Sequence, residues 1–435
     1  MKDRTRRLLL AIRKEIPEAL ADGQDHDDAE VAAMLRELGI ALIECEQPTQ
    51  VVSARLQVIA RKYTRHPVRV VVLPTALVVQ VGNVAYEVET VANPTTQLNL
   101  AARIDAIAEL AEVGAITPAD AAREAAAARN TKPRFGPITT MVGYVITTLG
   151  FGMVINPTWA SLWGYCFLGA VVAAIVLLGR PFPTLNAVLP TAAAMVVTVL
   201  ATWFVADAAN DGLLRVISPP LVAILPGLAL TIAAMELASA QVISGATRLI
   251  YGVTQLMLLV FGVGLGIHIA GRVAPQQPSP QMGSWSLYAA VVVIGIGLYI
   301  YLSAPKGSLV WLVLAVGVAL IGQKLGGLFL SPTHSGAVGA FLVVPFAMLG
   351  ARVKTSPPAI VMMLSAFWAL VPGALSFQEL GRAAAGVGGS DVATLGTTVA
   401  AIFSIALGTL IGWSGFETIS ARLARRIGVP GSPAE

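Results

Sequence analysis

The chain has 435 residues, of which 56% are hydrophobic and only 12% are charged. Soluble domains carry roughly a quarter charged residues, so this composition excludes a protein that is soluble throughout, as well as a fibrous or disordered chain. The charges are unevenly placed, because residues 1–135 hold 35 of the 54 Lys, Arg, Asp and Glu residues. The sequence therefore predicts a soluble domain that is joined to a large membrane domain.

The charge balance argues against a nucleic-acid partner, although the net charge is +4 and the isoelectric point is near 9.1. Residues 1–135 hold 17 basic and 18 acidic residues, whereas the rest of the chain holds 12 basic and 7 acidic residues. The positive excess lies in the membrane part, where the positive-inside rule accounts for it. Cys45 and Cys166 lie in different regions, with neither metal-site spacing nor a disulfide framework. We expect no metal, no cofactor and no nucleic-acid partner.

Residues 1–135 are predicted to form a compact α+β domain and linker that stay in the cytoplasm. The apolar run over 8–12 is too short for a signal peptide. Apolar spacing and turn residues predict helices over 31–45, 48–63, 101–113 and 118–129, and strands over 68–72, 76–81 and 84–91. Gly82-Asn83 is typical of a hairpin turn, and residues 129–135 form the link into the membrane.

The remaining sequence contains ten apolar stretches that could each cross a bilayer as a helix. They run over 137–155, 160–179, 188–206, 217–240, 243–270, 286–303, 308–325, 335–351, 356–377 and 393–415. The run from 217 to 270 is nearly continuous, and Glu236 and Arg248 mark the expected break within it.

The orientation follows from the basic residues of the short loops. With the N-terminus inside, the inner positions hold Lys132, Arg134, Arg180, Arg248, Lys306, Arg352, Lys354, Arg422, Arg425 and Arg426. The outer positions hold Arg215, Arg272, Lys324 and Arg382. The sequence therefore predicts a multi-pass protein of the cytoplasmic membrane with both termini in the cytoplasm.

An internal repeat is indicated at a shift of 146 residues. The matching residues are Pro226-Gly227 with Pro372-Gly373, Gly262 with Gly408, and Gly266 with Gly412. Each repeat would hold five spans, over 136–272 and 285–421, with a basic cytoplasmic tail over 422–435. Because five is odd, the second repeat must be inverted relative to the first, as in many secondary transporters.

Pro226-Gly227 and Pro372-Gly373 lie within the fourth span of each repeat. Proline removes a backbone donor and glycine permits unusual dihedral angles, so each pair is predicted to break its helix in two. The new half-helix N-terminus would bind an anion such as a carboxylate. We expect these four residues, together with Thr231, to bind substrate. A packed kink is the alternative.

Glu236 and Arg248 are charged residues in apolar surroundings. Glu236 lies about 15 Å beyond Pro226 along a helix. A carboxylate there is costly and tends to bind a proton or a cationic partner. We predict that Glu236 couples transport to protons and that Arg248 pairs with it or with a substrate carboxylate. A structural ion pair at the inner membrane surface is the alternative.

Two further features near the end of the fifth span are weaker indications of function. His268 is a candidate for proton coupling as a relay, with an interfacial residue as the alternative. The run Gly262-Val263-Gly264-Leu265-Gly266 superficially suggests a phosphate loop. It lacks the preceding strand and the Lys-Ser/Thr ending, so GxxxG helix packing is favoured.

Three stretches of the first repeat, over 226–237, 243–248 and 262–266, resemble the threonine/serine exporter family. In the later half, Pro357-Pro358 and the run over 370–373 fit the same pattern, and the resemblance covers nearly the whole chain. It implies a cytoplasmic N-terminal domain, ten membrane helices and proton-driven export of small hydroxy amino acids. The family has an acidic residue at the position of Glu236 and an arginine at Arg248, whereas Phe377-Gln378-Glu379 departs from its tyrosine-containing continuation.

The sequence therefore predicts an α-helical polytopic membrane protein, with ten helices in two inverted repeats and a small α+β soluble domain. Its predicted function is secondary active export of L-threonine and L-serine by alternating access. The expected partners are a small amino acid, protons and the lipid bilayer. Formation of a homo-oligomer is left as a possibility. The alternatives are an exporter of another small zwitterion, a structural or signalling membrane protein, and a membrane-anchored enzyme. For the enzyme, the N-terminal domain offers Ser53 and His66, but no local signature joins them.

Overall fold

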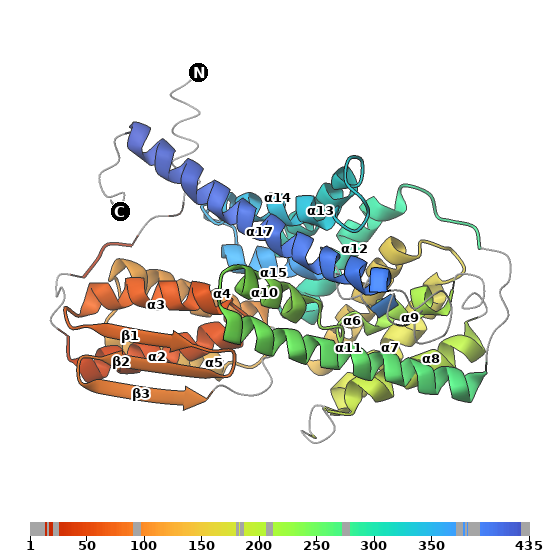
Figure 1. The fold of residues 1–435 in the computed structure, drawn as a ribbon, viewed down its shortest axis with the longest axis horizontal. Helices are drawn as coiled ribbons and strands as arrows, with labels where there is room; N and C mark the ends of the chain where they lie inside the picture. Colours follow the sequence, from red (N-terminus) through yellow and green to blue (C-terminus); the bar gives the residue numbers. More distant parts are fainter. Residues whose placement is uncertain are drawn as a thin grey trace.

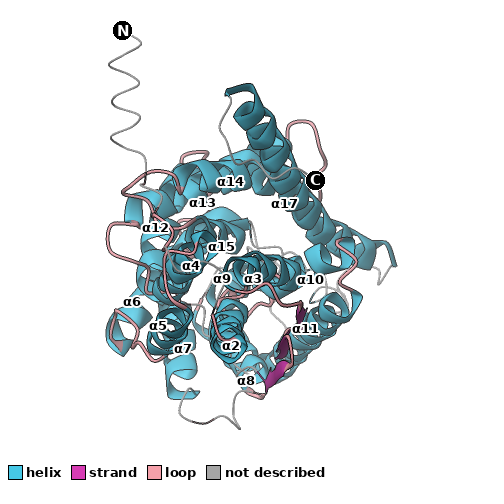
Figure 2. Cartoon of the chain, turned by 90° about the vertical axis from the view of Figure 1, so that its left-hand side faces the viewer, coloured by secondary structure: helices cyan, strands magenta, loops and turns pink. Residues whose placement is uncertain are grey.

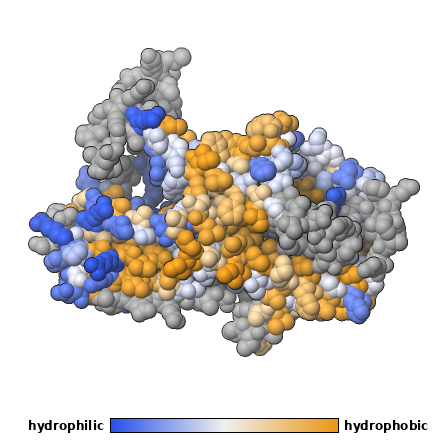
Figure 3. Space-filling model, in the orientation of Figure 1, coloured by the Kyte–Doolittle hydropathy of each residue, from blue (hydrophilic) through white to orange (hydrophobic). Residues whose placement is uncertain are grey.

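The computed structural model describes residues 14, 17–20, 26–89, 97–179, 182, 187–205, 212–271, 279–370, 377–378, 381 and 392–427. Figure 1 shows a small mixed domain at one end of a larger bundle of helices. Apolar residues cover the middle of the molecule, whereas hydrophilic residues gather at the end formed by the small domain (Figure 3).

The N-terminal domain packs four helices with a three-stranded sheet. The helices are α2 (Asp28–Glu44), α3 (Thr49–Tyr63), α4 (Leu98–Val113) and α5 (Pro118–Arg129), and the strands are β1 (Val68–Val72), β2 (Ala76–Val81) and β3 (Val84–Glu89). The sheet is antiparallel in the order β1-β2-β3. Helix α2 packs against β2, α3 and α5, and most of its residues from Val31 to Ile43 are buried. This helix is therefore the centre of the domain's core.

Local sequence explains where the last helix of this domain begins. The Oγ1 atom of Thr117 accepts a hydrogen bond of 3.2 Å from the backbone N–H of Asp120, so Thr117 is the N-cap of α5. Pro118 follows in the first helical position, where its missing N–H costs nothing. The preceding helix, α4, ends at Gly114, which has a left-handed φ of 77° that glycine adopts easily.

The helical bundle has helices in each of the ten apolar stretches, of which residues 206 and 371–376 lie outside the described residues. Its helices are α6 (Pro137–Ile155), α7 (Leu162–Gly179), α8 (Leu189–Phe204), α9 (Leu213–Leu221), α10 (Gly227–Ala238), α11 (Val242–Ala270), α12 (Ser286–Tyr301), α13 (Leu309–Gly326), α14 (Gly336–Gly350), α15 (Ala359–Leu370) and α17 (Val392–Ile427). Five are long and apolar enough to cross a membrane, namely α6, α7, α11, α13 and the part of α17 over Val399–Ser420. The shorter apolar helices are α8, α10, α12, α14 and α15.

The segment predicted as one span over 217–240 consists of two helices. Helix α9 begins at Leu213, four residues earlier than expected, and ends at Leu221, whereas α10 begins at Gly227. Pro219 and Pro220 lie within α9. Pro226 lacks a backbone donor and its ring clashes with the carbonyl four residues earlier, so regular helix is interrupted over 222–226. Arg215, which was expected in an outer loop, lies instead in the first turn of α9.

Helix α17 is longer than the span predicted over 393–415. It continues to Ile427, so the first residues of the predicted tail extend the helix. This segment is rich in alanine and arginine, which favour helix strongly. The helix therefore extends beyond the end of the apolar run.

Close glycine contacts recur in the two halves of the bundle at the shift of 146 residues. A Cβ atom at Gly262 of α11 would collide with the carbonyl oxygen of Thr191 on α8. A Cβ atom at Gly408 of α17 would collide with the carbonyl oxygen of Ala337 on α14, which lies 146 residues after Thr191. The second glycine of each pair makes the corresponding contact one turn later. The packing role predicted for these glycines is confirmed.

Helices α6 and α12 correspond at the same shift, and they pack directly against each other. We call their contact the α6–α12 seam. Its facing pairs are Gly143 with Ile300, Thr147 with Gly297, and Gly150 with Ile294. Residue numbers rise along α6 as they fall along α12, so the helices are antiparallel. Small residues at the contact let the two backbones approach closely.

Candidate functional site

The N-terminal domain docks onto one end of the bundle through backbone hydrogen bonds. The N–H groups of Leu98 and Asn99, at the start of α4, donate to the carbonyls of Leu302 and Ser303 at 2.9 and 3.1 Å. Viewed from the domain's end, α3 and α4 lie in front of α10 and α15 (Figure 2). This arrangement brings the turn between α2 and α3 to the membrane helix that carries Glu236.

Glu236 lies at the centre of a charge cluster, defined here as Glu46, Glu236 and Arg248. Its side chain is fully buried, and Oε1 accepts a hydrogen bond of 2.9 Å from the backbone N–H of Thr49. Its Oε2 lies 3.4 Å from Nε of Arg248, an ion pair without hydrogen-bond geometry. Nη1 of Arg248 lies 3.3 Å from Oε2 of Glu46. One guanidinium therefore bridges an acid of the membrane part and an acid of the N-terminal domain.

The backbone of the N-terminal domain also stabilises the Glu236 carboxylate. Thr49 is the first residue of α3, after Pro48 at the N-cap. Unpaired N–H groups and the helix dipole make a helix N-terminus attractive to a carboxylate. Glu236 thus has a helix N-terminus on one oxygen and a guanidinium near the other, which together offset part of the cost of burying its charge.

Protonation of Glu46 is favoured by its surroundings. Burial raises the pKa of the Glu46 carboxyl, Arg248 opposes this effect, and the nearby Glu236 adds to it. The cluster holds two carboxylates and one guanidinium, so a single added proton would make it neutral. Such an arrangement can take up and release a proton as a unit.

Backbone strain is concentrated where the N-terminal domain meets the bundle. Among the described residues other than glycine, φ is positive at Glu46 (59°), Ala240 (61°) and Ser303 (49°). Glu46 belongs to the charge cluster, Ala240 lies in the turn between α10 and α11, and Ser303 accepts the hydrogen bond from α4. Left-handed backbone is unfavourable for these residue types and often occurs at contacts that function or move.

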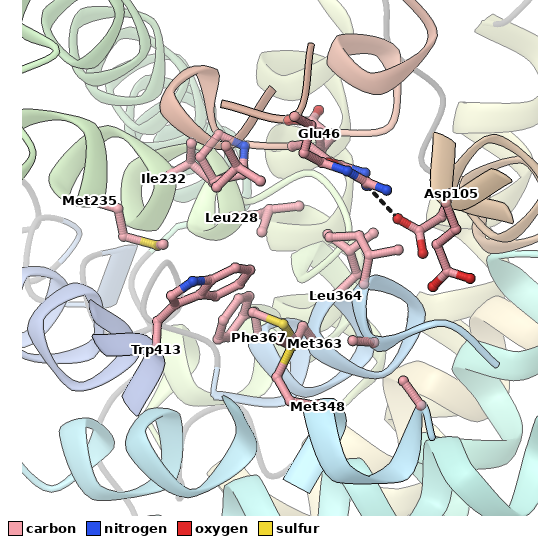
Figure 4. A pocket seen from close by; sticks show the side chains of 18 of the residues that line it. Glu46, Asp105, Leu228, Ile232, Met235, Met348, Met363, Leu364, Phe367 and Trp413 are labelled. Atoms are coloured by element: carbon pink, nitrogen blue, oxygen red, sulfur yellow. Dashed lines mark hydrogen bonds and ion pairs between the residues drawn. The ribbon is translucent and has the colours of Figure 1, made fainter. Parts of the chain in front are cut away.

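A cavity of about 430 Å³ lies beside the charge cluster, between the N-terminal domain and helices α10, α14, α15 and α17 (Figure 4). Glu46 is the member of the cluster that lines it. Arg55 lies at the domain side, 2.5 Å from Asp105 and 2.6 Å from Glu112. Burial alone would lower the pKa of the Arg55 guanidinium, but the two carboxylates outweigh burial and hold that pKa above its usual value. Arg55 therefore stays charged at this side of the cavity.

The predicted helix break lies deeper in the bundle. Pro226 is the buried N-cap of α10, and Gly227 is its first residue. The hydroxyl of Thr231 is buried and donates to the carbonyl of Gly227 at 2.9 Å. Glu236 lies nine residues further along the same helix, about 14 Å from Gly227. Helix α10 therefore connects the break to the charge cluster but holds the two apart.

Other predicted site residues lie elsewhere. Pro372 and Gly373 lie outside the described residues. His268 is exposed near the end of α11, twenty residues and about 30 Å from Arg248, so the structure does not bring it to Glu236. Within the described residues, His66 hydrogen-bonds Asp28, with 2.8 Å between Nδ1 and Oδ2, and no hydrogen bond joins it to Ser53.

Sequence reasoning missed Glu46 and Thr49. The segment Glu46-Gln47-Pro48-Thr49 signals a helix start, but nothing local pairs it with a membrane residue about 190 positions later. The cavity residues were also missed, because apolar side chains in an apolar sequence carry no distinguishing pattern.

Comparison with known proteins identifies the family. The model of the family described as "Putative threonine/serine exporter" matches residues 33–270, which is more than half of the chain and runs from α2 to the end of α11. No curated protein and no solved structure matches the chain. The described residues include five helices that are long and apolar enough to cross a membrane and five shorter apolar helices. The chain is a multi-pass membrane protein of the transporter type. It belongs to the threonine/serine exporter family.

Proposed function

We propose that this protein is a secondary active transporter that exports L-threonine and L-serine from the cytoplasm, driven by the proton motive force. Family membership supports the substrate class. The observation that carries the proposal is the fully buried Glu236, paired with Arg248 in a chain whose other membrane helices are almost free of charge. Ionisable residues in such surroundings commonly mark transport and proton pathways.

The two halves of the bundle are proposed to be inverted repeats that move against each other. Two observations support this idea. Helices α6 and α12, which correspond at the shift of 146 residues, pack antiparallel to each other. The contact of Gly262 with Thr191 also recurs at the same shift as the contact of Gly408 with Ala337. Alternating access by rocking of two repeats follows this geometry in many transporters.

The charge cluster is proposed to carry the coupling proton. Glu236 and Glu46 share Arg248, so protonation of either acid frees part of the guanidinium's bonding capacity for a substrate carboxylate. The break before Gly227 offers a second anion site at the start of α10. Pro372-Gly373 is proposed to offer the corresponding site in the second repeat, and His268 a relay toward the outer surface.

The proposed topology has ten spans and both termini in the cytoplasm. Three of the basic residues assigned to the inner side lie at the end of the bundle that carries the N-terminal domain. Arg134 donates to the carbonyl of Ala304 at 3.0 Å, the carbonyl of Arg352 accepts from Lys14, and Arg248 pairs with Glu46. An N-terminal domain on the cytoplasmic side agrees with the positive-inside rule.

Counterflow of radiolabelled L-serine and L-threonine into proteoliposomes tests the function, with and without a pH gradient. We expect counterflow of both amino acids and faster efflux when protons flow inward. Glu236→Gln should retain binding but lose the response to the gradient. The absence of counterflow for both amino acids would contradict the substrate class, and an unchanged gradient response in Glu236→Gln would contradict the role of Glu236.

A further inference from the structure

The cavity beside the charge cluster has the size of a small-molecule site. Its volume of about 430 Å³ lies within the range of roughly 300–1,000 Å³ that such sites occupy. Its walls come from the N-terminal domain and from α10, α14, α15 and α17, so it exists only where the two regions meet. Leu228, the residue after Gly227, also lines it, so the cavity extends along α10 from Met235 to the helix break that the sequence predicts as an anion site.

Most of the cavity wall is apolar. Met235, Met348 and Met363 contribute thioethers, and Phe367 and Trp413 contribute aromatic rings. In Figure 4 the Trp413, Phe367 and Met348 side chains lie together at one side of the cavity. Methionine and aromatic side chains form an adaptable surface that suits flexible apolar groups. Water beside such a wall is poorly held, and an apolar group that displaces it gains affinity.

This wall offers little to a hydroxyl group. The indole N–H of Trp413 already donates to Glu417 at 2.7 Å. A threonine or serine hydroxyl placed here would lose its hydrogen bonds to water without a replacement, which is unfavourable. The apolar wall therefore discriminates against the substrates expected from the family.

The remaining wall carries both signs of charge. Glu46 and Asp105 lie at the other side of the cavity from Trp413 (Figure 4). Arg352 also lines the cavity, and its guanidinium lies 5.4 Å from the ring of Phe416. Arg352 makes no ion pair in the part of the chain that the structure describes. Its guanidinium is thus available to a carboxylate. Asp105 binds Arg55 through Oδ1, and its Oδ2 atom can accept a hydrogen bond from an ammonium group.

We propose that this cavity binds a free amino acid with a long apolar side chain, of the size of leucine or methionine. The side chain lies against the methionine and aromatic wall, and the zwitterionic end lies toward Arg352 and Asp105. The site rests on the proposed function only in taking a transported class of molecule, an amino acid, and it extends that class from hydroxy to apolar side chains.

The proposal predicts a graded selectivity. Each additional buried methylene group should tighten binding by roughly fourfold, because its transfer from water contributes about 0.8 kcal/mol. L-valine and L-threonine provide a matched pair, because they have nearly the same shape and differ by a methyl group in place of a hydroxyl. L-valine should bind at least about tenfold more tightly than L-threonine.

Equilibrium binding of tritiated L-leucine to the purified full chain in nanodiscs tests this selectivity without any gradient. Unlabelled L-methionine should compete strongly, L-valine less strongly, and L-threonine and L-serine weakly. Competition by L-threonine equal to that by L-valine would overturn the proposal, as would the absence of L-leucine binding. Because no transport is measured, these outcomes are independent of the counterflow result.

Matched substitutions locate the binding. Met348→Gln places an amide of similar length in the cavity wall and should weaken L-leucine binding at least about tenfold. Met257→Gln is the control, because Met257 lies on α11, is 44% exposed and does not line the cavity; it should bind like the unmodified chain. Leu228→Gln, on the cavity face of α10, serves as the second variant if Met348→Gln does not fold. Equal L-leucine affinity in the cavity variants and the control would overturn the assignment.

Discussion

Two contacts join distant parts of this chain, and they differ in kind. The α6–α12 seam is built from glycines, Thr147 and apolar side chains, and the two helix backbones nearly touch. The junction of the N-terminal domain with the bundle is built from backbone hydrogen bonds, the charge cluster and a cavity. The close packing of the seam leaves no room for a larger side chain, and its stability should not depend on pH. The junction has room for larger side chains, and its stability should depend on the charge of the residues that form it.

The distribution of strain sharpens this contrast. The non-glycine residues with positive φ in the described chain are Glu46, Ala240 and Ser303, and none of them belongs to the seam. A contact that stores strain and surrounds a cavity is easier to open than a close-packed one. The junction is therefore expected to open more easily than the seam, about which the two repeats are proposed to rock.

Gly297→Leu adds a large side chain at the α6–α12 seam and should have the largest effect on stability. A Cβ atom at this position would already lie 2.6 Å from the backbone nitrogen of Thr147, so the helices must separate, at a cost on the order of 3 kcal/mol or more. We expect loss of monodisperse protein in detergent by size-exclusion chromatography. Gly264→Leu is the control, because a Cβ atom there meets nothing within 4 Å. A well-folded Gly297→Leu variant would refute close packing at the seam.

Arg248→Met removes the cation of the charge cluster at the junction. It leaves two neighbouring carboxylates without their cation, and the expected destabilisation is about 3 kcal/mol. Thermal unfolding of the full chain measures it, with Arg215→Met as a control because Arg215 is exposed at the start of α9. The double variant Glu236→Met and Arg248→Met should recover part of the loss, since it removes both buried partners. A double variant that is less stable than Arg248→Met would contradict the ion pair.

Glu46→Gln tests the pH response of the junction. The folded protein raises the pKa of Glu46, with burial as the main cause, so folding favours the protonated form. This contribution is fully present below the usual glutamate pKa and is lost as the pH rises through the raised value. Thermal stability should therefore fall with rising pH above about 4.5, and Glu46→Gln should flatten that fall. The same pH slope in both proteins would rule out Glu46 as its source.

Thr117→Ala should have the smallest effect, because it touches neither contact. Loss of the N-cap of α5 should cost about 1 kcal/mol, confined to the N-terminal domain. Hydrogen exchange of the α5 amides measures it, and Thr117→Asn should preserve the cap. A change in exchange at α6 or α12 would show that the domain and the seam are coupled, against the contrast drawn above.

Local sequence predicted most elements well because the signals were local. Apolar runs located the bundle helices, and the turn at Gly82-Asn83 and the cap at Thr117 located parts of the N-terminal domain. The errors arose where neighbouring signals competed. Pro226 disturbs the turn that precedes it, so the interruption between α9 and α10 begins at residue 222 and is wider than the Pro226-Gly227 pair that marks it in the sequence.

The candidate site was only half predictable. A buried acid and arginine stand out in an apolar sequence, which predicts a pairing of Glu236 with Arg248 as one possibility. Glu46 lies in a region rich in charge, where one more carboxylate is unremarkable. Its partner, Arg248, is 202 residues away, so only the docking of the domain could reveal the contact.

The sequence by itself determined that this chain is a membrane protein with a charged N-terminal domain, because the free energy of placing residues in lipid depends on composition and run length. The tertiary structure alone decided that a strained turn and a helix N-terminus from that domain meet Glu236, and that methionine and aromatic side chains from four helices surround one cavity. Such contacts depend on how distant surfaces fit together, and that fit leaves no periodic trace in the chain.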